Sequence, residues 1–151
     1  WVLTMTSCAA RCRYCSWGNG LPMAHRSASV TVGCLEEMVG PGSMMVASPV
    51  YLVCAEINAG KKWMREFAAE KEKSKVVDFQ IITDVRADWL DQEQVDLLVR
   101  MKTHEVIAAL ESPNPTVLDF MDRKMDPLKF VKGYKMFFSI IPANGIFSIP
   151  S

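Results

Sequence analysis

Three cysteines lie close together near the start of the chain, at Cys8, Cys12 and Cys15. Three residues separate the first two, two residues separate the last two, and Tyr14 stands directly before the third. Thiolates at this spacing suit soft metal centres, and three of them can hold three irons of a cubane iron–sulfur cluster. The fourth iron would then have no protein ligand, and an open metal position indicates reactivity rather than a structural role.

Other interpretations of these cysteines are a set of buried thiols or half of a zinc site. A zinc site would normally be completed by a second Cys or His pair, and neither His25 nor His104 belongs to such a pattern. A disulfide framework fits poorly, because the chain has five cysteines, an odd number. We therefore favour an iron–sulfur cluster at the cysteine loop.

The composition excludes several classes of function. The chain has 151 residues, enough for one domain with a core, and 17 basic residues balance 17 acidic ones. This balance gives no nucleic-acid signal, and the apolar stretches are too short for a membrane span. Free cysteines without a secretion signal favour a cytoplasmic setting.

The cysteine loop resembles the Cys-x-x-x-Cys-x-aromatic-Cys loop of the radical S-adenosylmethionine (radical SAM) enzymes. The resemblance implies that Cys8, Cys12 and Cys15 ligate a [4Fe-4S] cluster and that the amino and carboxylate groups of SAM chelate its fourth iron. Reductive cleavage of SAM then yields a 5′-deoxyadenosyl radical. It also implies a reductant such as flavodoxin or ferredoxin, and a Tyr14 backbone that faces the adenine.

Strand-like and helix-like segments alternate along the chain, which predicts an α/β fold built of parallel β-α-β units. With the resemblance, this becomes a partial (β/α)6 TIM-like radical SAM barrel, strands one to five. We expect residues 1–151 to be an incomplete radical SAM core domain, a fragment. Asn58, the Asp91/Gln94 pair and Asn114, which precedes Pro115 at a helix N1 position, are predicted to cap helices. The expected strands are 1–7, 44–53, 76–85, 105–110 and 140–149, and the expected helices are 34–39, 59–74, 92–101, 115–123 and 127–138.

Two candidate SAM contacts follow the second and third predicted strands. Glu56 stands where the family has a Gly-Gly-Glu motif that receives the SAM amino group, although Cys54 and Ala55 replace the glycines. Glu56 also fits a solvated acid in the first turn of a helix. Arg86 lies in a string that resembles the family's T-E-x-R-A-D, and it is expected to reach the SAM carboxylate or the floor of the site.

Further candidates follow the fourth predicted strand. Glu111 and Ser112 resemble the family's G-(I/L)-(E/Q)-S and are expected to approach the ribose and methionine parts of SAM. Residues 112–123 resemble S-x-N-P-x-V-L-x-x-M-x-R and end at Arg123, either a cation favoured at a helix C-terminus or a contact of SAM or substrate. These strings resemble the subset with a preceding cobalamin-binding domain, which leaves cobalamin open as a cofactor.

The expected function is that of a radical SAM enzyme acting on an unknown substrate. An alternative is an iron–sulfur electron-transfer or structural module that does not cleave SAM, which the missing glycine pair favours. A third interpretation is a truncated piece whose cysteine motif is a relic.

Overall fold

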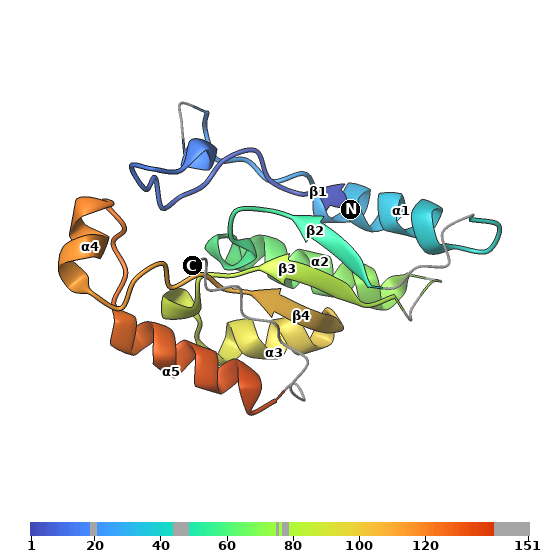
Figure 1. Cartoon of the computed structure of the whole chain (residues 1–151). Helices are drawn as coiled ribbons and strands as arrows, with labels where there is room; N and C mark the ends of the chain where they lie inside the picture. Colours follow the sequence, from blue (N-terminus) through green and yellow to red (C-terminus); the bar gives the residue numbers. More distant parts are fainter. Residues whose placement is uncertain (19–20, 44–48, 75, 77–78, 141–151) are drawn as a thin grey trace.

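The computed structural model describes residues 1–18, 21–43, 49–74, 76 and 79–140. Its centre is a parallel sheet whose strands follow one another in chain order, β1-β2-β3-β4 (Figure 1). The register pairs Leu3 with Val53, Tyr51 with Ile82 and Asp84 with Ile107. The strands are β1 (Val2–Leu3), β2 (Val50–Val53), β3 (Ile81–Asp84) and β4 (Thr103–Ile107).

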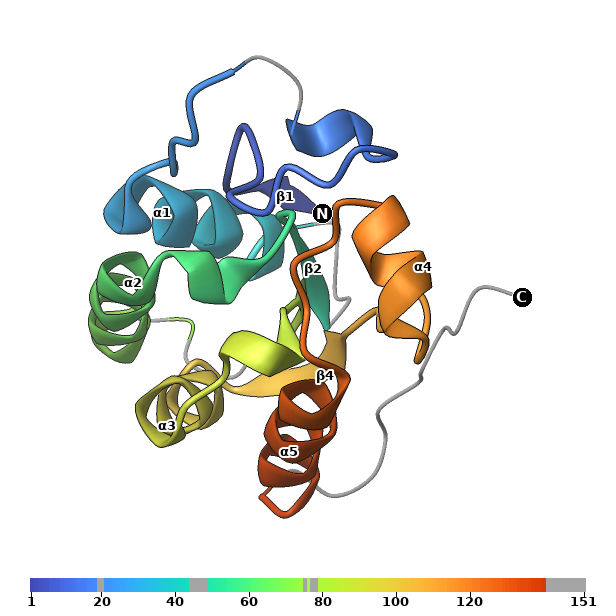
Figure 2. The ribbon, with the colours of Figure 1, turned by 90° about the vertical axis from the view of Figure 1, so that its left-hand side faces the viewer.

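Helices surround the sheet as an arc, which is the outer layer of a partly formed barrel (Figure 2). The segment between β2 and β3 forms α2, the segment between β3 and β4 forms α3, and α5 packs against η3 just after β3. No described helix combines the length and hydrophobicity that a bilayer crossing requires. The helices are α1 (Ala28–Val39), α2 (Lys61–Lys73), α3 (Gln92–Arg100), α4 (Pro115–Phe120) and α5 (Pro127–Phe138), with the 3-10 helices η1 (Ser16–Gly18), η2 (Ile57–Ala59) and η3 (Ala87–Trp89).

The two faces of the sheet differ in burial. Side chains alternate between the faces of a strand, and in β2 and β3 every second residue is fully buried. Leu52 and Ile81 belong to the buried set and pack in one core with the helix residues Met64 and Phe67. The other face, which we call the inner face, carries half-buried residues, namely Tyr51, Val53, Ile82 and Asp84.

The strands are shorter than the sequence predicts. The expected strand at 1–7 is reduced to Val2–Leu3, with one further backbone bond from Thr4 N–H to the Val53 carbonyl at 3.0 Å. Among the described residues of its expected range, the third strand covers Ile81–Asp84, and the fourth begins and ends earlier than expected. The apolar stretches of the sequence are therefore longer than the segments that pair in the sheet. The predictions for residues 44–48, 77–78 and 141–149 lie outside the described residues.

The first helix is longer than predicted. The expected range of 34–39 is only its second half, because α1 begins at Ala28 and the Ser27 side chain accepts a hydrogen bond from the Val30 N–H. The β-branched residues near its start have low helix propensity, but Thr31 and Val32 are buried. Tertiary packing against α2 thus outweighs local propensity.

The predicted cap of the second helix is wrong. Asn58 lies in η2, and α2 begins after Gly60 without a side-chain cap. The Asn58 amide instead accepts from the Arg86 N–H and donates to the Arg86 carbonyl, both at 2.9 Å. These two bonds hold together the chain segments that leave β2 and β3. The predicted capping box of Asp91 and Gln94 is confirmed.

Candidate functional site

A cavity of about 280 Å³ lies between the cysteine loop and the carboxyl ends of β2, β3 and β4. In β/α barrels this end of the sheet carries the chemistry. Eight of the nine site residues predicted from the sequence line it, from the cysteine loop, the strand ends and the segment after α4. The ninth, Ser112, lies outside the lining, and its hydroxyl accepts from the Asn114 N–H at 3.1 Å.

The cysteine loop presents all three thiols to this cavity. Cys8 and Cys12 are buried, Cys15 is half-buried, and all are free. The loop turns at Arg11, whose φ is 50°, and the Cys15 N–H donates to the Cys12 carbonyl at 3.1 Å. No described group of three metal-ligating side chains is already arranged around a metal position. The donor set nevertheless fits a cluster, because three soft sulfurs share one cavity wall.

Glu56 is buried beside the first cysteine. Only 3% of its surface is exposed, and each carboxylate oxygen lies 3.0 Å from the Cys8 sulfur, whose thiol donates to it. Burial, together with this hydrogen bond, raises the pKa of Cys8 to about 11. The alternative of a solvated first-turn acid is therefore wrong for Glu56.

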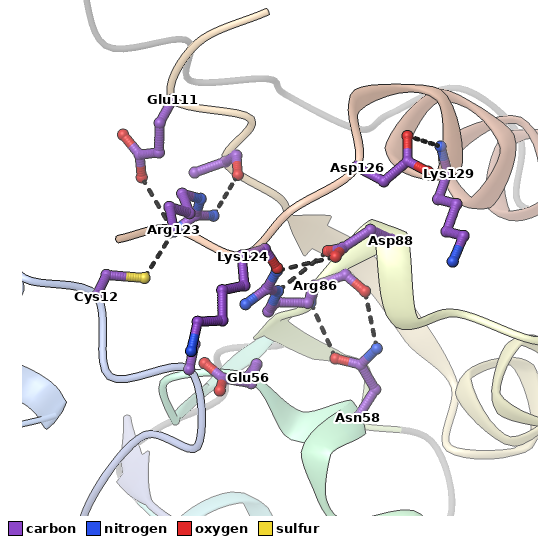
Figure 3. Close-up of polar contacts among 12 residues, drawn as sticks. Cys12, Glu56, Asn58, Arg86, Asp88, Glu111, Arg123, Lys124, Asp126 and Lys129 are labelled. Atoms are coloured by element: carbon purple, nitrogen blue, oxygen red, sulfur yellow. Dashed lines mark hydrogen bonds and ion pairs between the residues drawn. The ribbon is translucent and has the colours of Figure 1, made fainter. Parts of the chain in front are cut away.

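Arg86 lies on the cavity wall, but its guanidinium is engaged by the protein. Its Nε and Nη2 donate to the two oxygens of Asp88 at 3.0 and 2.8 Å, and Nη2 also donates to the Lys124 carbonyl at 2.6 Å (Figure 3). The guanidinium carbon lies 4.3 Å from the centre of the Trp89 ring. These contacts fix Arg86 as an anchor between η3 and the segment after α4, and its predicted contact with SAM stays a prediction.

Arg123 connects the cysteine loop with the end of β4 (Figure 3). Its Nη1 lies 2.9 Å from the Tyr14 hydroxyl, 3.9 Å from the Cys12 sulfur and 3.7 Å from the Glu111 carboxylate. Its Nη2 donates to the Ala109 carbonyl at 2.6 Å, and its buried Nε has no partner within the described residues. The Arg123 guanidinium therefore contacts groups around the cavity and does not cap the carbonyls at the end of α4.

Tyr14 and Glu111 complete this corner of the cavity. Burial raises the pKa of Tyr14 to about 12, and the charge of Arg123 opposes that shift. Glu111 has a φ of 67°, a left-handed conformation that is strained for a residue with a side chain. Such strain persists where the surrounding structure enforces it, and it is often found at functional sites.

Sequence reasoning missed a pair on the inner face, Tyr51 and Asp84. The Tyr51 hydroxyl donates a hydrogen bond to the Asp84 carboxylate, and both side chains line the cavity. Burial raises the pKa of Asp84 to about 6; the bond from Tyr51 opposes this shift and the charge of Glu56 adds to it. The available signal was the two-residue periodicity, which places both side chains opposite the buried face.

Comparisons with known proteins bear on the fold. No family model and no curated protein matches the chain. Among solved structures, it is similar to the radical SAM methyltransferase TsrM from Kitasatospora setae, bound to tryptophan substrate and a SAM analogue, with a TM-score of 0.78 and 16% identity over 97% of this chain. It is also similar to the cobalamin-dependent radical SAM enzyme OxsB, bound to aqua-cobalamin and SAM, with a TM-score of 0.79 and 14% identity over 97% of this chain.

The likeness covers only part of those enzymes. The chain spans 29% of the TsrM chain and 23% of the OxsB chain. At these identities the likeness concerns the fold, and it confirms the partial barrel predicted from the sequence. The cysteine loop, the sheet order and these neighbours agree: the chain has the fold of the radical SAM barrel, as found in cobalamin-dependent members of that superfamily.

Proposed function

We propose that this chain is the core of a radical SAM enzyme that cleaves SAM reductively to modify a substrate not yet identified. The observation that carries the proposal is the convergence of eight predicted site residues on one cavity at the carboxyl ends of the strands. Cys8, Cys12 and Cys15 would hold the [4Fe-4S] cluster. When bound, the cluster would supply an electron and an open coordination position.

The other residues have roles that their contacts support. Loss of the Cys8 proton on metal binding would free the Glu56 carboxylate, which is suited to accept the SAM amino group. Arg123 has a buried Nε without a described partner, so it can donate to the SAM carboxylate while Glu111 orients it. Tyr14 stays in place because its hydroxyl accepts from Arg123. We also expect that a protein reductant supplies the electron to the cluster and that the protein works in the cytoplasm.

Cobalamin belongs to the proposal as a conditional cofactor. Cobalamin is bound in solved structures of TsrM and OxsB, and the chain shares their barrel fold. It covers less than a third of either protein. Cobalamin would therefore take part if a cobalamin-binding domain accompanies this barrel.

A second candidate is an iron–sulfur electron-transfer module without SAM cleavage. Cys54 and Ala55 replace the glycines that would bring backbone close to SAM, and the Arg86 guanidinium is already engaged by Asp88. Both observations reduce the number of groups free to bind SAM. Such a module would bind the cluster, but the cluster would not respond to added SAM.

Anaerobic reconstitution with iron and sulfide separates these candidates. We expect ~4 irons per chain, and a low-temperature EPR signal of the reduced cluster that changes when SAM is added. The Cys12→Ala variant should lose that signal. Cys34→Ala is the matched control, because Cys34 is half-buried on α1 and does not line the cavity.

Each outcome has a distinct meaning. A cluster signal that is indifferent to SAM would support the electron-transfer module. A Cys12→Ala protein that still assembles the full cluster would contradict the ligand assignment. If Cys12→Ala and Cys34→Ala lose the cluster signal equally, the substitutions impair folding rather than remove a ligand. Circular dichroism of both variants checks this.

A further inference from the structure

The pair formed by Tyr51 and Asp84 has no role in the proposed cluster and SAM site. The two side chains lie on neighbouring strands of the inner face, and the tyrosine hydroxyl fixes one carboxylate oxygen of the aspartate. Val53 and Ile107 line the same cavity, and the sheet register pairs Ile107 directly with Asp84. The carboxylate is thus held in place beside an apolar surface.

More carboxylates than cations line the cavity. Three carboxylates line it, on Glu56, Asp84 and Glu111. The two lining arginines already have acidic partners, since Arg86 binds Asp88 and Arg123 lies beside Glu111. Among the described residues, no cation pairs with Asp84 or Glu56, and burial of a carboxylate without a cation is costly.

A ligand can supply the missing cation. A metal ion would need several ligands, whereas the Asp84 carboxylate has only the Tyr51 hydroxyl as a hydrogen-bond partner among the described residues. An ammonium group needs only one fixed carboxylate and an apolar surface for the atoms that carry it. Since Glu56 is assigned to SAM in the proposed function, Asp84 is the carboxylate left for the substrate.

We propose that Asp84, held by Tyr51, anchors the substrate through a protonated amino group, so that the substrate is an amine with an apolar body. This inference rests on the proposed function, because it places the substrate in the same cavity as SAM. Tyr51 acts as a positioning residue: its hydroxyl directs the carboxylate, and Val53 and Ile107 contact the apolar part of the ligand.

The test measures binding of two small probes to the cluster-reconstituted protein with SAM present. Benzylamine is cationic at pH 7.5, and benzyl alcohol is a neutral molecule of similar shape. We expect benzylamine to bind about tenfold more tightly, as titration calorimetry or ligand-observed NMR would show. Asp84→Asn should abolish this preference, and Tyr51→Phe should reduce it. Asp96→Asn, an exposed change on α3, is the matched control and should keep it.

Three results would overturn the inference: equal affinity for the two probes, an unchanged preference in Asp84→Asn, or no binding of either probe at millimolar concentration. If Asp84→Asn does not fold by circular dichroism, a full preference in Tyr51→Phe overturns it. The SAM-dependent EPR change of the same preparation reports separately on the proposed function. A normal EPR change without amine preference rejects the substrate assignment alone, whereas an absent EPR change rejects the proposed function.

Discussion

The two ends of the sheet treat buried charge differently. At the amino ends of the strands, Lys71 of α2 is 2% exposed, and its ammonium donates to the carbonyls of Phe79 and Met101, just before β3 and β4. The same nitrogen lies 4.3 Å from the centre of the Phe79 ring. Here the protein itself satisfies the charge, so the lysine ties two strands and a helix together.

At the carboxyl ends, the charged groups are only partly satisfied. Among the described residues, Asp84 has no cationic partner and the Nε of Arg123 has no acceptor. Glu111 adds a strained backbone at the same place. Arg86 is the exception, because its bidentate contact with Asp88 makes it resemble Lys71. A buried charge that the protein satisfies indicates a structural role, and one that it leaves open indicates a ligand.

The largest expected effect is at the amino ends. Lys71→Met would leave two buried carbonyls without a donor, which should lower the free energy of unfolding by about 3 kcal/mol. Urea denaturation measures this loss. Lys73→Met on the same helix is the control and should cost less than about 0.5 kcal/mol, because the Lys73 side chain is 70% exposed. Similar losses in both variants would contradict the comparison.

Removing a buried charge at the carboxyl ends of the strands should have the opposite effect on stability. Asp84→Asn keeps an acceptor for the Tyr51 hydroxyl and removes the cost of burying a carboxylate. We expect it to raise the free energy of unfolding at pH 7 by about 2 kcal/mol, measured without ligand by the same urea titration. A clear loss of stability would show that the ionised carboxylate is structural.

The pH dependence sharpens this point. Because burial raises the pKa of Asp84 from 3.8 to about 6, the folded state holds this proton over a range where the unfolded state has released it. The Asp84 contribution to stability is therefore lost as the pH rises from about 4 to about 6. The difference between Asp84→Asn and the unchanged chain should grow across this window and be flat above it. A difference independent of pH would contradict the raised pKa.

The smallest expected effect concerns backbone strain beside Arg123. Asp122 follows α4 with a φ of 51°, which glycine adopts without penalty. Asp122→Gly should therefore raise the unfolding free energy by about 0.5 kcal/mol. Asp119→Gly inside α4 should lower it by about 1 kcal/mol. Thermal unfolding of the two variants checks the opposite signs, and a loss in both would mean that Asp122 has a contact that matters more than its conformation.

The sequence predicts best where the determinants are local. The Asp91/Gln94 capping box and the Asn114 cap before Pro115 are found as expected, because each joins groups two or three residues apart. The α/β class follows from the alternation of strands and helices. The strand-end residues converge because parallel strands end at the same edge.

Features that depend on partners far along the chain were not predictable. Asn58 looked like a helix cap, yet its amide binds the backbone of Arg86, 28 residues away. The Arg86 guanidinium donates to the Lys124 carbonyl, 38 residues away, and nothing near Arg86 in the sequence indicates this contact. Tyr51 lies in an apolar run, and nothing in its neighbours shows that it meets an aspartate on the next strand.

The alternation of side chains in β2 and β3 separates two tasks along one stretch of chain. Leu52 and Thr83 are fully buried, whereas their sequence neighbours Tyr51 and Asp84 line the cavity. Substitutions at the second kind of position should alter what the barrel accepts without disturbing its core. Adjacent residues of one strand are therefore under different physical constraints, one set by the core and the other by the cavity.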